Sequence, residues 1–168
     1  MDASASIRES FDEAAATLQA FLESPDGLEG VRRFAEEWTG RFRGDRAALP
    51  AVAFSDPSQL TCIANDFGYD EVFARYVEAL GTEGDVLVAI STSGNSPNVL
   101  RAVEAARERG LTTVGLLGKG GGKLRERVDI PIVVPRATSS DRIQEVHIQV
   151  LHIVIETVER ELFPENYA

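Results

Sequence analysis

The fold is decided by the stretch from 85 to 118, which reads D-V-L-V-A-I-S-T-S-G-N-S-P-N-V-L-R-A-V-E-A-A-R-E-R-G-L-T-T-V-G-L-L-G. Two continuous apolar runs, 85–91 and 111–118, flank a segment that has a helical pattern from 96 to 110 and ends in Arg and Gly. Strands that are apolar along their whole length are typical of parallel sheets with both faces covered. The stretch therefore predicts a strand–helix–strand unit with parallel strands.

Similar elements extend this unit in both directions along the chain. Short apolar runs at 50–55 and 130–135 predict two further strands. A helix is expected over 70–81, with Asp70 as its N-cap and Gly81 just past its end. The N-D-F-G segment that precedes it (65–68) is interpreted as a loop. Apolar residues at helical spacing predict three more helices, over 5–23, 27–43 and 140–162.

Together these elements predict the α/β class, as a three-layer α/β/α sandwich around a parallel, flavodoxin-like sheet. The length of 168 residues suits one domain, so we expect a single domain over 1–168. Within it, N-terminal helices (5–43) precede an α/β core (50–135) and a C-terminal helix (140–162). Ligands of such sheets bind beyond the carboxyl ends of the strands.

Composition narrows the range of functions. A formal net charge of −10, from 27 acidic residues against 17 Lys and Arg, argues against nucleic acid as a partner. Cys62 is the single cysteine, so a disulfide within the chain and a cysteine-based zinc cluster are both excluded. No apolar run approaches the ~18 residues of a membrane span, so no membrane partner is expected. The polar start of the sequence lacks a secretory signal, and the cytoplasm is the expected compartment.

The turn I-S-T-S-G-N-S-P-N (90–98) has the features of an anion site. Ser96 is a good N-cap with Pro97 behind it, and the start of a helix offers free N–H groups and a positive dipole. Neutral hydroxyl donors would surround the anion, from Ser91, Thr92, Ser93 and Ser96. The pattern is neither a dinucleotide fingerprint nor a P-loop, so no nucleotide cofactor is expected. The alternative is an ordinary capped turn that is rich in small polar residues.

The C-terminal helix offers candidates for proton transfer. Gln144 and His152 share a broad face of it, whereas His147 points elsewhere. A histidine titrates near neutral pH and suits proton transfer or metal binding, although a histidine on an apolar helix is more often a core residue.

Two acidic residues elsewhere are further candidates. Glu37 beside Trp38 could be a carboxylate of raised pKa, suited to acid–base work, or a surface ion-pair partner of Arg41. Asp66 could orient a substrate hydroxyl or close a turn.

Four segments in this order resemble the sedoheptulose 7-phosphate isomerase family, also called phosphoheptose isomerases, whose members are single sugar-isomerase (SIS) domains. The segments are F-A-E-E-W-T-G-R-F (34–42), N-D-F-G (65–68), R-Y-V-E-A-L-G-x-x-G-D-V-L-V-A-I-S-T-S-G-N-S-x-N (75–98) and D-R-I-Q-E-V-H-I (141–148). The resemblance implies an aldose–ketose isomerisation that makes a heptose 7-phosphate for heptose nucleotides and surface glycans such as lipopolysaccharide. It also implies a homotetramer with sites at subunit interfaces.

The resemblance implies roles for the candidate residues. Glu37 and His152 would move protons through an enediol. The four hydroxyls of 91–96 would hold the phosphate, Asp66 and Gln144 would orient the substrate, and Arg41 would lie near the site. Some family members bind zinc, through residues that match Glu37, Gln144 and His152 together with one further His.

This chain departs from the family pattern in two places. Arg33 stands in the position of that further His, which disfavours zinc. Just before it, D-G-L-E-G-V-R-R (26–33) runs directly into F-A-E-E, so roughly one βα unit is missing: the family's first strand and its G-N-G-G-S loop. The loop supplies further phosphate and hydroxyl donors in the family, so we expect this shortened chain to preserve sugar-phosphate binding better than turnover.

The missing strand would be central in the family's sheet. Because unpaired buried backbone groups are costly, we expect either that the remaining strands pair around the gap, in a sheet of one strand fewer, or that the sheet is unstable. Two other functions stay open: a non-catalytic SIS domain that senses sugar phosphate or regulates a replication initiator, and a structural partner in a mixed oligomer.

Overall fold

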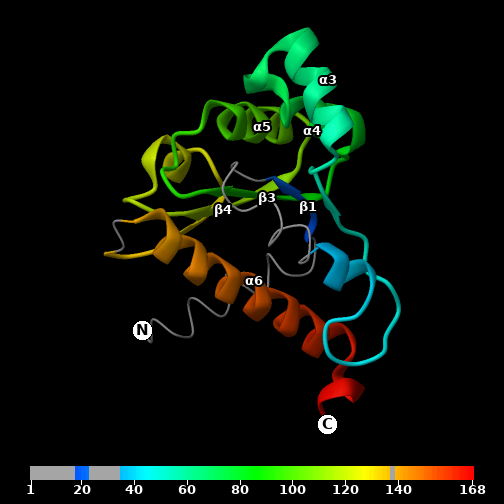
Figure 1. The fold of residues 1–168 in the computed structure, drawn as a ribbon. Helices are drawn as coiled ribbons and strands as arrows, with labels where there is room; N and C mark the ends of the chain where they lie inside the picture. Colours follow the sequence, from blue (N-terminus) through cyan, green and yellow to red (C-terminus); the bar gives the residue numbers. More distant parts are fainter. Residues whose placement is uncertain (1–17, 23–34, 137–138) are drawn as a thin grey trace.

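A computed structural model of the chain describes residues 18–22, 35–136 and 139–168, with the backbone alone described over 18–22. Its centre is a parallel sheet of five strands in the order β2-β1-β3-β4-β5 (Figure 1). The strands are β1 (Leu18–Leu22), β2 (Val52–Ala53), β3 (Val86–Ser91), β4 (Thr112–Leu117) and β5 (Ile130–Val133).

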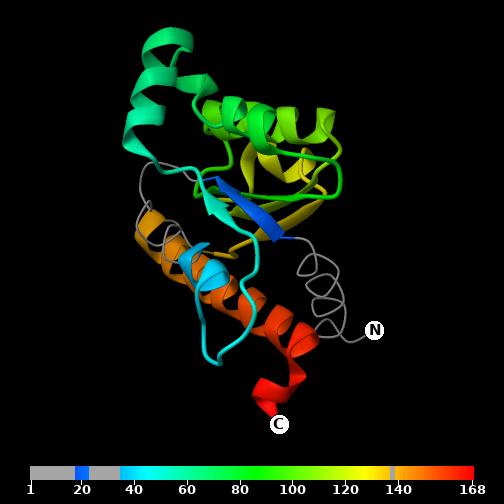
Figure 2. The ribbon, with the colours of Figure 1, turned by 90° about the vertical axis from the view of Figure 1, so that its right-hand side faces the viewer.

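Helices cover both faces of this sheet. One face carries α3 (Pro57–Phe67), α4 (Ala74–Leu80) and α5 (Pro97–Glu108), and the other carries the long α6 (Ser140–Leu162), as Figures 1 and 2 show. The described chain also has a short helix over 35–39 and three short 3₁₀ turns, Tyr69–Glu71, Gly122–Glu126 and Pro164–Tyr167. The predicted three-layer α/β/α sandwich with a parallel sheet is confirmed. None of the described helices could cross a membrane, because none is both long and apolar enough.

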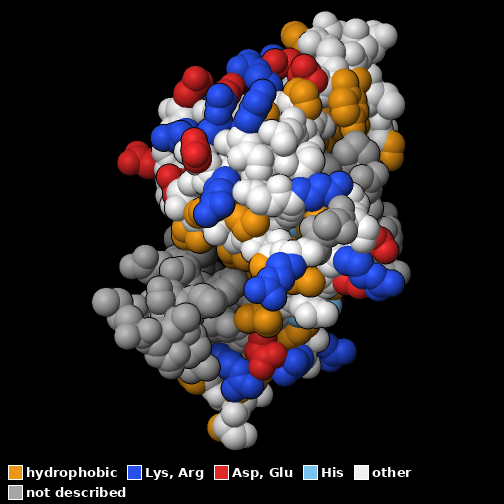
Figure 3. Space-filling view, turned by 90° about the vertical axis from the view of Figure 1, so that its left-hand side faces the viewer, with side chains coloured by type: hydrophobic (Ala, Val, Ile, Leu, Met, Phe, Trp, Pro, Cys, Tyr) orange, Lys and Arg blue, Asp and Glu red, His pale blue; other side chains and the backbone are white. Residues whose placement is uncertain are grey.

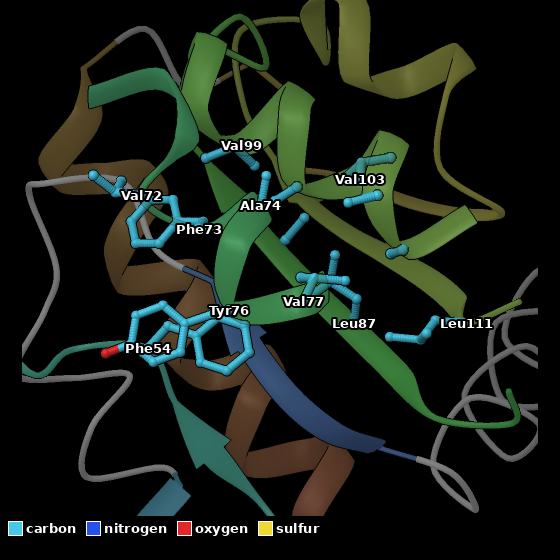
Figure 4. Close-up of a cluster of buried hydrophobic side chains, with 14 of the residues drawn as sticks. Phe54, Val72, Phe73, Ala74, Tyr76, Val77, Leu87, Val99, Val103 and Leu111 are labelled. Atoms are coloured by element: carbon cyan, nitrogen blue, oxygen red, sulfur yellow. The ribbon is translucent and has the colours of Figure 1, made fainter. Parts of the chain in front are cut away.

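Strand β3 shows how the sequence builds two cores. Its residues are all buried, and successive side chains point to opposite faces of the sheet. Leu87 and Ala89 pack with α4 and α5 in the cluster that Figure 4 shows. Val88 and Ile90 pack on the other side with α6. The continuous apolar run was therefore a correct sign of a strand covered on both faces.

Strand β1 corrects the prediction of a helix over 5–23. Its backbone pairs with both neighbours, Ala20 lying opposite Val52 of β2 and Leu87 of β3. The expected gap in the sheet is thus filled by a segment that the periodicity had assigned to a helix, and β2 and β3 do not pair across it. A short and mostly apolar segment such as L-Q-A-F-L can form either a helix or a strand. The strand is favoured here because it pairs the backbone N–H and C=O groups of β2 and β3 that would otherwise lack partners. The remainder of the predicted helix lies outside the described residues.

Helix α3 also departs from the prediction, because N-D-F-G (65–68) is not a loop: Asn65, Asp66 and Phe67 form the last turn of the helix. The helix has a clear start signal, since the Asp56 side chain accepts a hydrogen bond from the Gln59 amide at 2.8 Å and Pro57 follows at the first position.

The helix predicted over 70–81 is shorter than expected. Asp70 is not its N-cap but lies in the preceding 3₁₀ turn, and α4 begins at Ala74. Gly81 is the C-cap, as predicted. The second predicted helix, 27–43, is described from residue 35 and ends at 39, while its first part, with Arg33, lies outside the described residues.

Candidate functional site

The loop between β3 and α5 forms a compact cradle of hydroxyl groups, which we call the serine cradle (Ser91, Thr92, Ser93 and Ser96). The hydroxyls of Ser91 and Ser96 lie 3.1 Å apart, and the Ser91 hydroxyl accepts a hydrogen bond from the Gly94 amide at 3.1 Å. Ser96 is the N-cap of α5, yet its hydroxyl makes no capping bond to the helix. The cradle therefore offers neutral donors beside the free N–H groups of a helix start, an arrangement that suits a phosphate group.

A second loop packs directly against the cradle. The Gly94 carbonyl accepts a hydrogen bond from the Leu124 amide at 3.0 Å, and the Asn95 side chain accepts one from the Lys123 amide at 3.1 Å. Gly94 has a φ of 64°, and a Cβ there would lie 1.9 Å from the Gly121 carbonyl oxygen. Only glycine fits this close approach of two backbones, which explains the Gly within S-T-S-G-N-S.

The start of α6 joins the cradle as well. The Ser140 hydroxyl lies 3.3 Å from the Thr92 hydroxyl and accepts a hydrogen bond from the Lys119 ammonium at 3.4 Å. Figure 3 faces this end of the sheet and shows several Lys and Arg side chains on the surface. Ser140 was not predicted as part of the site, although a Ser-Ser-Asp helix start at the same edge of the sheet was a usable signal.

Glu37 and His152 form the second part of the site, and the structure brings these two predicted residues together. The Glu37 Oε2 and His152 Nε2 atoms lie 3.9 Å apart, with the two side chains 30% and 50% exposed. Glu37 lies on the helix 35–39, which is held against α6 by the buried Trp38 ring. The His152 ring stacks on Phe42, with ring centroids 5.8 Å apart.

The Glu37 carboxyl has a raised pKa, which matches the first of the two alternatives that the sequence left open. Burial is the main cause, the nearby His152 acts in the opposite direction, and the charge of Glu159 raises the pKa further. Its Oε2 atom is buried and makes no hydrogen bond in the described structure. A carboxyl group held in this way can accept a proton from a substrate and return it.

The other predicted site residues lie in different places. Arg41 is exposed beyond the end of the helix 35–39 and forms no ion pair with Glu37. Asp66 lies on α3, on the opposite side of the sheet from α6. Its Oδ1 atom accepts a hydrogen bond from the side-chain Nδ2 of Asn65 at 2.8 Å. Gln144 is half-buried near the start of α6, about 12 Å along the helix from His152.

His147 points elsewhere than His152, as predicted. It is 2% exposed, and its Nε2 atom lies 3.2 Å from the Leu117 carbonyl oxygen at the end of β4. Burial lowers the pKa of His147, although the bond to that carbonyl acts in the opposite direction. His147 is therefore a core residue, whereas the core alternative considered for His152 is wrong, because the His152 side chain is half exposed.

The serine cradle lies at the start of α6, whereas the Glu37–His152 pair lies near its middle. Ser140, which touches the cradle, precedes His152 by more than three turns, or about 18 Å along the axis. Within the described part of the chain, no group of three His, Cys, Asp or Glu side chains could hold a metal ion. Within one chain, the serine cradle and the Glu37–His152 pair are thus two separate groups of side chains.

Comparisons with known proteins show what the chain is similar to. A family model for the SIS domain matches residues 29–118. A phosphoheptose isomerase from Fusobacterium nucleatum is 60% identical over 134 residues, which cover 80% of this chain and 69% of that protein. One from Yersinia enterocolitica is 45% identical over 185 residues, covering 93% of this chain and 96% of that protein.

Solved structures give the same picture. The structure of phosphoheptose isomerase GmhA from Neisseria gonorrhoeae matches with a TM-score of 0.81 at 36% identity, covering 94% of this chain and 86% of that one. The alignment of 185 residues with the Yersinia protein is longer than this chain of 168 residues, so that relative carries residues with no counterpart here. This agrees with the missing segment that the sequence indicated.

Proposed function

Because the chain belongs to the SIS-domain family of phosphoheptose isomerases, we propose that it converts sedoheptulose 7-phosphate into D-glycero-D-manno-heptose 7-phosphate. The observation that carries the proposal is the contact between Glu37 and His152, a partly buried carboxyl of raised pKa beside an imidazole. An aldose–ketose isomerisation needs two such groups, one to move a proton between neighbouring carbons and one to serve the oxygens.

In the proposed reaction, the Glu37 carboxylate removes the proton from C1 of the ketose, while His152 donates a proton to O2. The product of this step is a neutral enediol. Glu37 then returns its proton to C2, and His152 takes the proton of O1, which leaves an aldehyde at C1. Glu37 has returned the proton that it removed, and His152 has gained one proton for the one that it gave, so the step balances and needs no redox partner and no nucleotide.

The serine cradle is the proposed site for the phosphate. Its hydroxyls and the start of α5 supply neutral donors to the phosphate oxygens, while Lys119 lies within reach of the same hydroxyl cluster through Ser140. Gln144 and Asp66 are proposed to orient the sugar hydroxyls, with Arg41 near the site.

A homotetramer with shared sites is part of the proposal. A heptose phosphate is shorter than the ~18 Å that separate the cradle end of α6 from His152, so one substrate cannot reach both halves within a chain. In a homotetramer, the serine cradle of one copy can lie beside the Glu37–His152 pair of another, so that one substrate contacts both. The same contact between copies can bring Asp66 on α3 into the site of a neighbouring copy. The enzyme would work in the cytoplasm and supply heptose for surface glycans such as lipopolysaccharide.

Zinc has no place in the proposed steps. Of the residues that the family resemblance implies as ligands, Glu37 and His152 are adjacent, but Gln144 lies just over two helical turns away from His152. Together with Arg33 in the place of a histidine, the donors present in one chain do not fit a zinc site.

The test is an aldose–ketose assay with sedoheptulose 7-phosphate, in which the protein and its His152→Ala variant are compared. We expect turnover by the protein and a loss of at least ~100-fold in the variant, because a positioned acid–base group contributes that much or more. Equal turnover would remove His152 from the mechanism. Binding of the sugar phosphate in a calorimeter without any turnover would show a sensor instead of an enzyme.

A further inference from the structure

A buried ion pair lies behind the Glu37–His152 contact and takes no part in the proposed reaction. The Arg46 and Glu159 side chains are both 0% exposed, and the Arg46 Nε atom donates to Glu159 Oε1 at 2.6 Å. The second oxygen of Glu159 accepts a hydrogen bond from the Tyr167 hydroxyl at 2.7 Å. Burying two charges is expensive, so such a pair calls for an explanation other than stability alone.

Arg46 also binds the end of the helix that carries Glu37. Its Nη2 atom donates to the Glu37 carbonyl at 2.7 Å and its Nη1 atom donates to the Trp38 carbonyl at 2.8 Å. Two weaker bonds reach the carbonyls of Gly40 and Ala47, at 3.3 and 3.1 Å. The last carbonyls of a helix have no partner within it, and a cation is favourable there. The guanidinium therefore fixes the backbone of Glu37 itself.

Through its bond to Arg46, Glu159 connects the end of the helix 35–39 to α6. It follows His152 on α6 by seven residues, which is close to two full turns, so both residues lie on nearly the same side of the helix. Figure 2 shows the short helix 35–39 lying against α6, where Trp38 packs with Leu151 and Ile155. One guanidinium thus bridges the backbone that carries Glu37 and the helix that carries His152.

We propose that Arg46 is a positioning residue, which together with Glu159 sets the distance between Glu37 and His152. The inference rests on the proposed function, because it assigns the ion pair a role in that reaction. Arginine suits this role, since its planar fork of five donors can serve a carboxylate and several carbonyls at once. Lysine, with one ammonium group, cannot reproduce that geometry.

The test compares three variants, each checked for folding by circular dichroism and assayed at the pH of its own maximal rate. Arg46→Lys keeps the charge and loses the fork. Glu159→Gln keeps the shape and an acceptor for Arg46 but loses the charge. Arg101→Lys is the matched control, because Arg101 is an exposed arginine that binds Glu71 and Glu104 away from the site.

We expect kcat of Arg46→Lys to fall by about 10- to 100-fold with KM within about twofold, since a displacement of ~1 Å at reacting groups has such effects. Glu159→Gln should lose thermal stability, because it leaves a buried cation, yet keep kcat within about threefold. Arg101→Lys should change neither. If Arg46→Lys does not fold, the double variant Arg46→Met with Glu159→Leu removes both charges and should show the same loss of kcat.

Two results would overturn the inference. One is a folded Arg46→Lys or double variant whose kcat stays within about threefold of the parent protein. The other is a Glu159→Gln variant that loses as much kcat as Arg46→Lys, because kcat would then follow charge or stability and not geometry. If the parent protein itself does not turn over sedoheptulose 7-phosphate, the proposed function fails, and the inference fails with it.

Discussion

The serine cradle takes its hydroxyls from six consecutive residues, 91–96, whereas Glu37 and His152 come from a short helix near the start of the described chain and from α6 near its end. The cradle is a local structure, fixed by one strand end, one helix start and a glycine at φ 64°. The Glu37–His152 pair exists only because Trp38 and the Arg46–Glu159 ion pair bring two distant segments together.

The difference between the two regions has a functional meaning. A phosphate site needs donors that point at one place, and a single loop can supply them. Proton transfer needs two groups held at a fixed separation, and a tertiary contact between two distant segments supplies that separation. If this division is real, substitutions in the pair should lower kcat, and substitutions in the cradle should raise KM.

The largest effect is expected from Glu37→Gln. The amide has nearly the same shape but cannot accept a proton from carbon, so kcat should fall by about 10³-fold or more, with little change in KM. Steady-state kinetics with sedoheptulose 7-phosphate measures both. Glu36→Gln is the matched control, because Glu36 is the exposed neighbour on the same helix. A fall in kcat of equal size for both variants would contradict the assignment of the base to Glu37.

A smaller effect, on KM instead of kcat, is expected from Ser96→Ala. One hydrogen bond to a charged group contributes about 1.5–3 kcal/mol, so KM should rise by at least about tenfold while kcat changes little. The fold should tolerate the change, since the Ser96 hydroxyl makes no capping bond to α5. Ser58→Ala, at an exposed position in the first turn of α3, should leave KM unaltered. A Ser96→Ala variant that loses kcat at constant KM would place the cradle in the chemical step instead.

The same contrast explains how far the sequence could predict the structure. The cradle was predicted with all four hydroxyl residues, and α6 was predicted with its bounds, because strand ends, caps and helical periodicity are local signals. For Glu37 the sequence left two alternatives open, and the structure favours the raised pKa, with His152 and not Arg41 beside the carboxyl group.

What the sequence could not predict depends on pairing over long distances. Segment 18–22 is a strand because it pairs with β2 on one side and with β3 on the other, and these strands would otherwise have unpaired backbone groups. The residues of the segment itself do not indicate these distant partners. Arg46 was not singled out for the same reason, since its partner Glu159 lies far away in the chain. Helix α3, in contrast, was missed although Asp56, Pro57 and Gly68 mark both its ends.

The smallest effect concerns His147, which lies on α6 between the two regions and binds the end of β4. Burial lowers the pKa of His147 in the folded protein, so the folded state resists the proton that the unfolded chain takes up below about pH 6.5. The stability that this histidine contributes is therefore present above pH 6.5 and is lost as the pH falls towards its lowered pKa. His147→Gln can keep the bond to the Leu117 carbonyl but cannot titrate.

Thermal unfolding of both proteins between pH 7.5 and pH 5 measures this difference. We expect the parent protein to be equally or more stable at pH 7.5, and its advantage over His147→Gln to shrink or reverse by pH 5, at up to about 1.4 kcal/mol per pH unit. Other titrating groups are common to both proteins and cancel in the comparison. A difference in stability that stays constant over this range would contradict the lowered pKa of His147 in the folded protein.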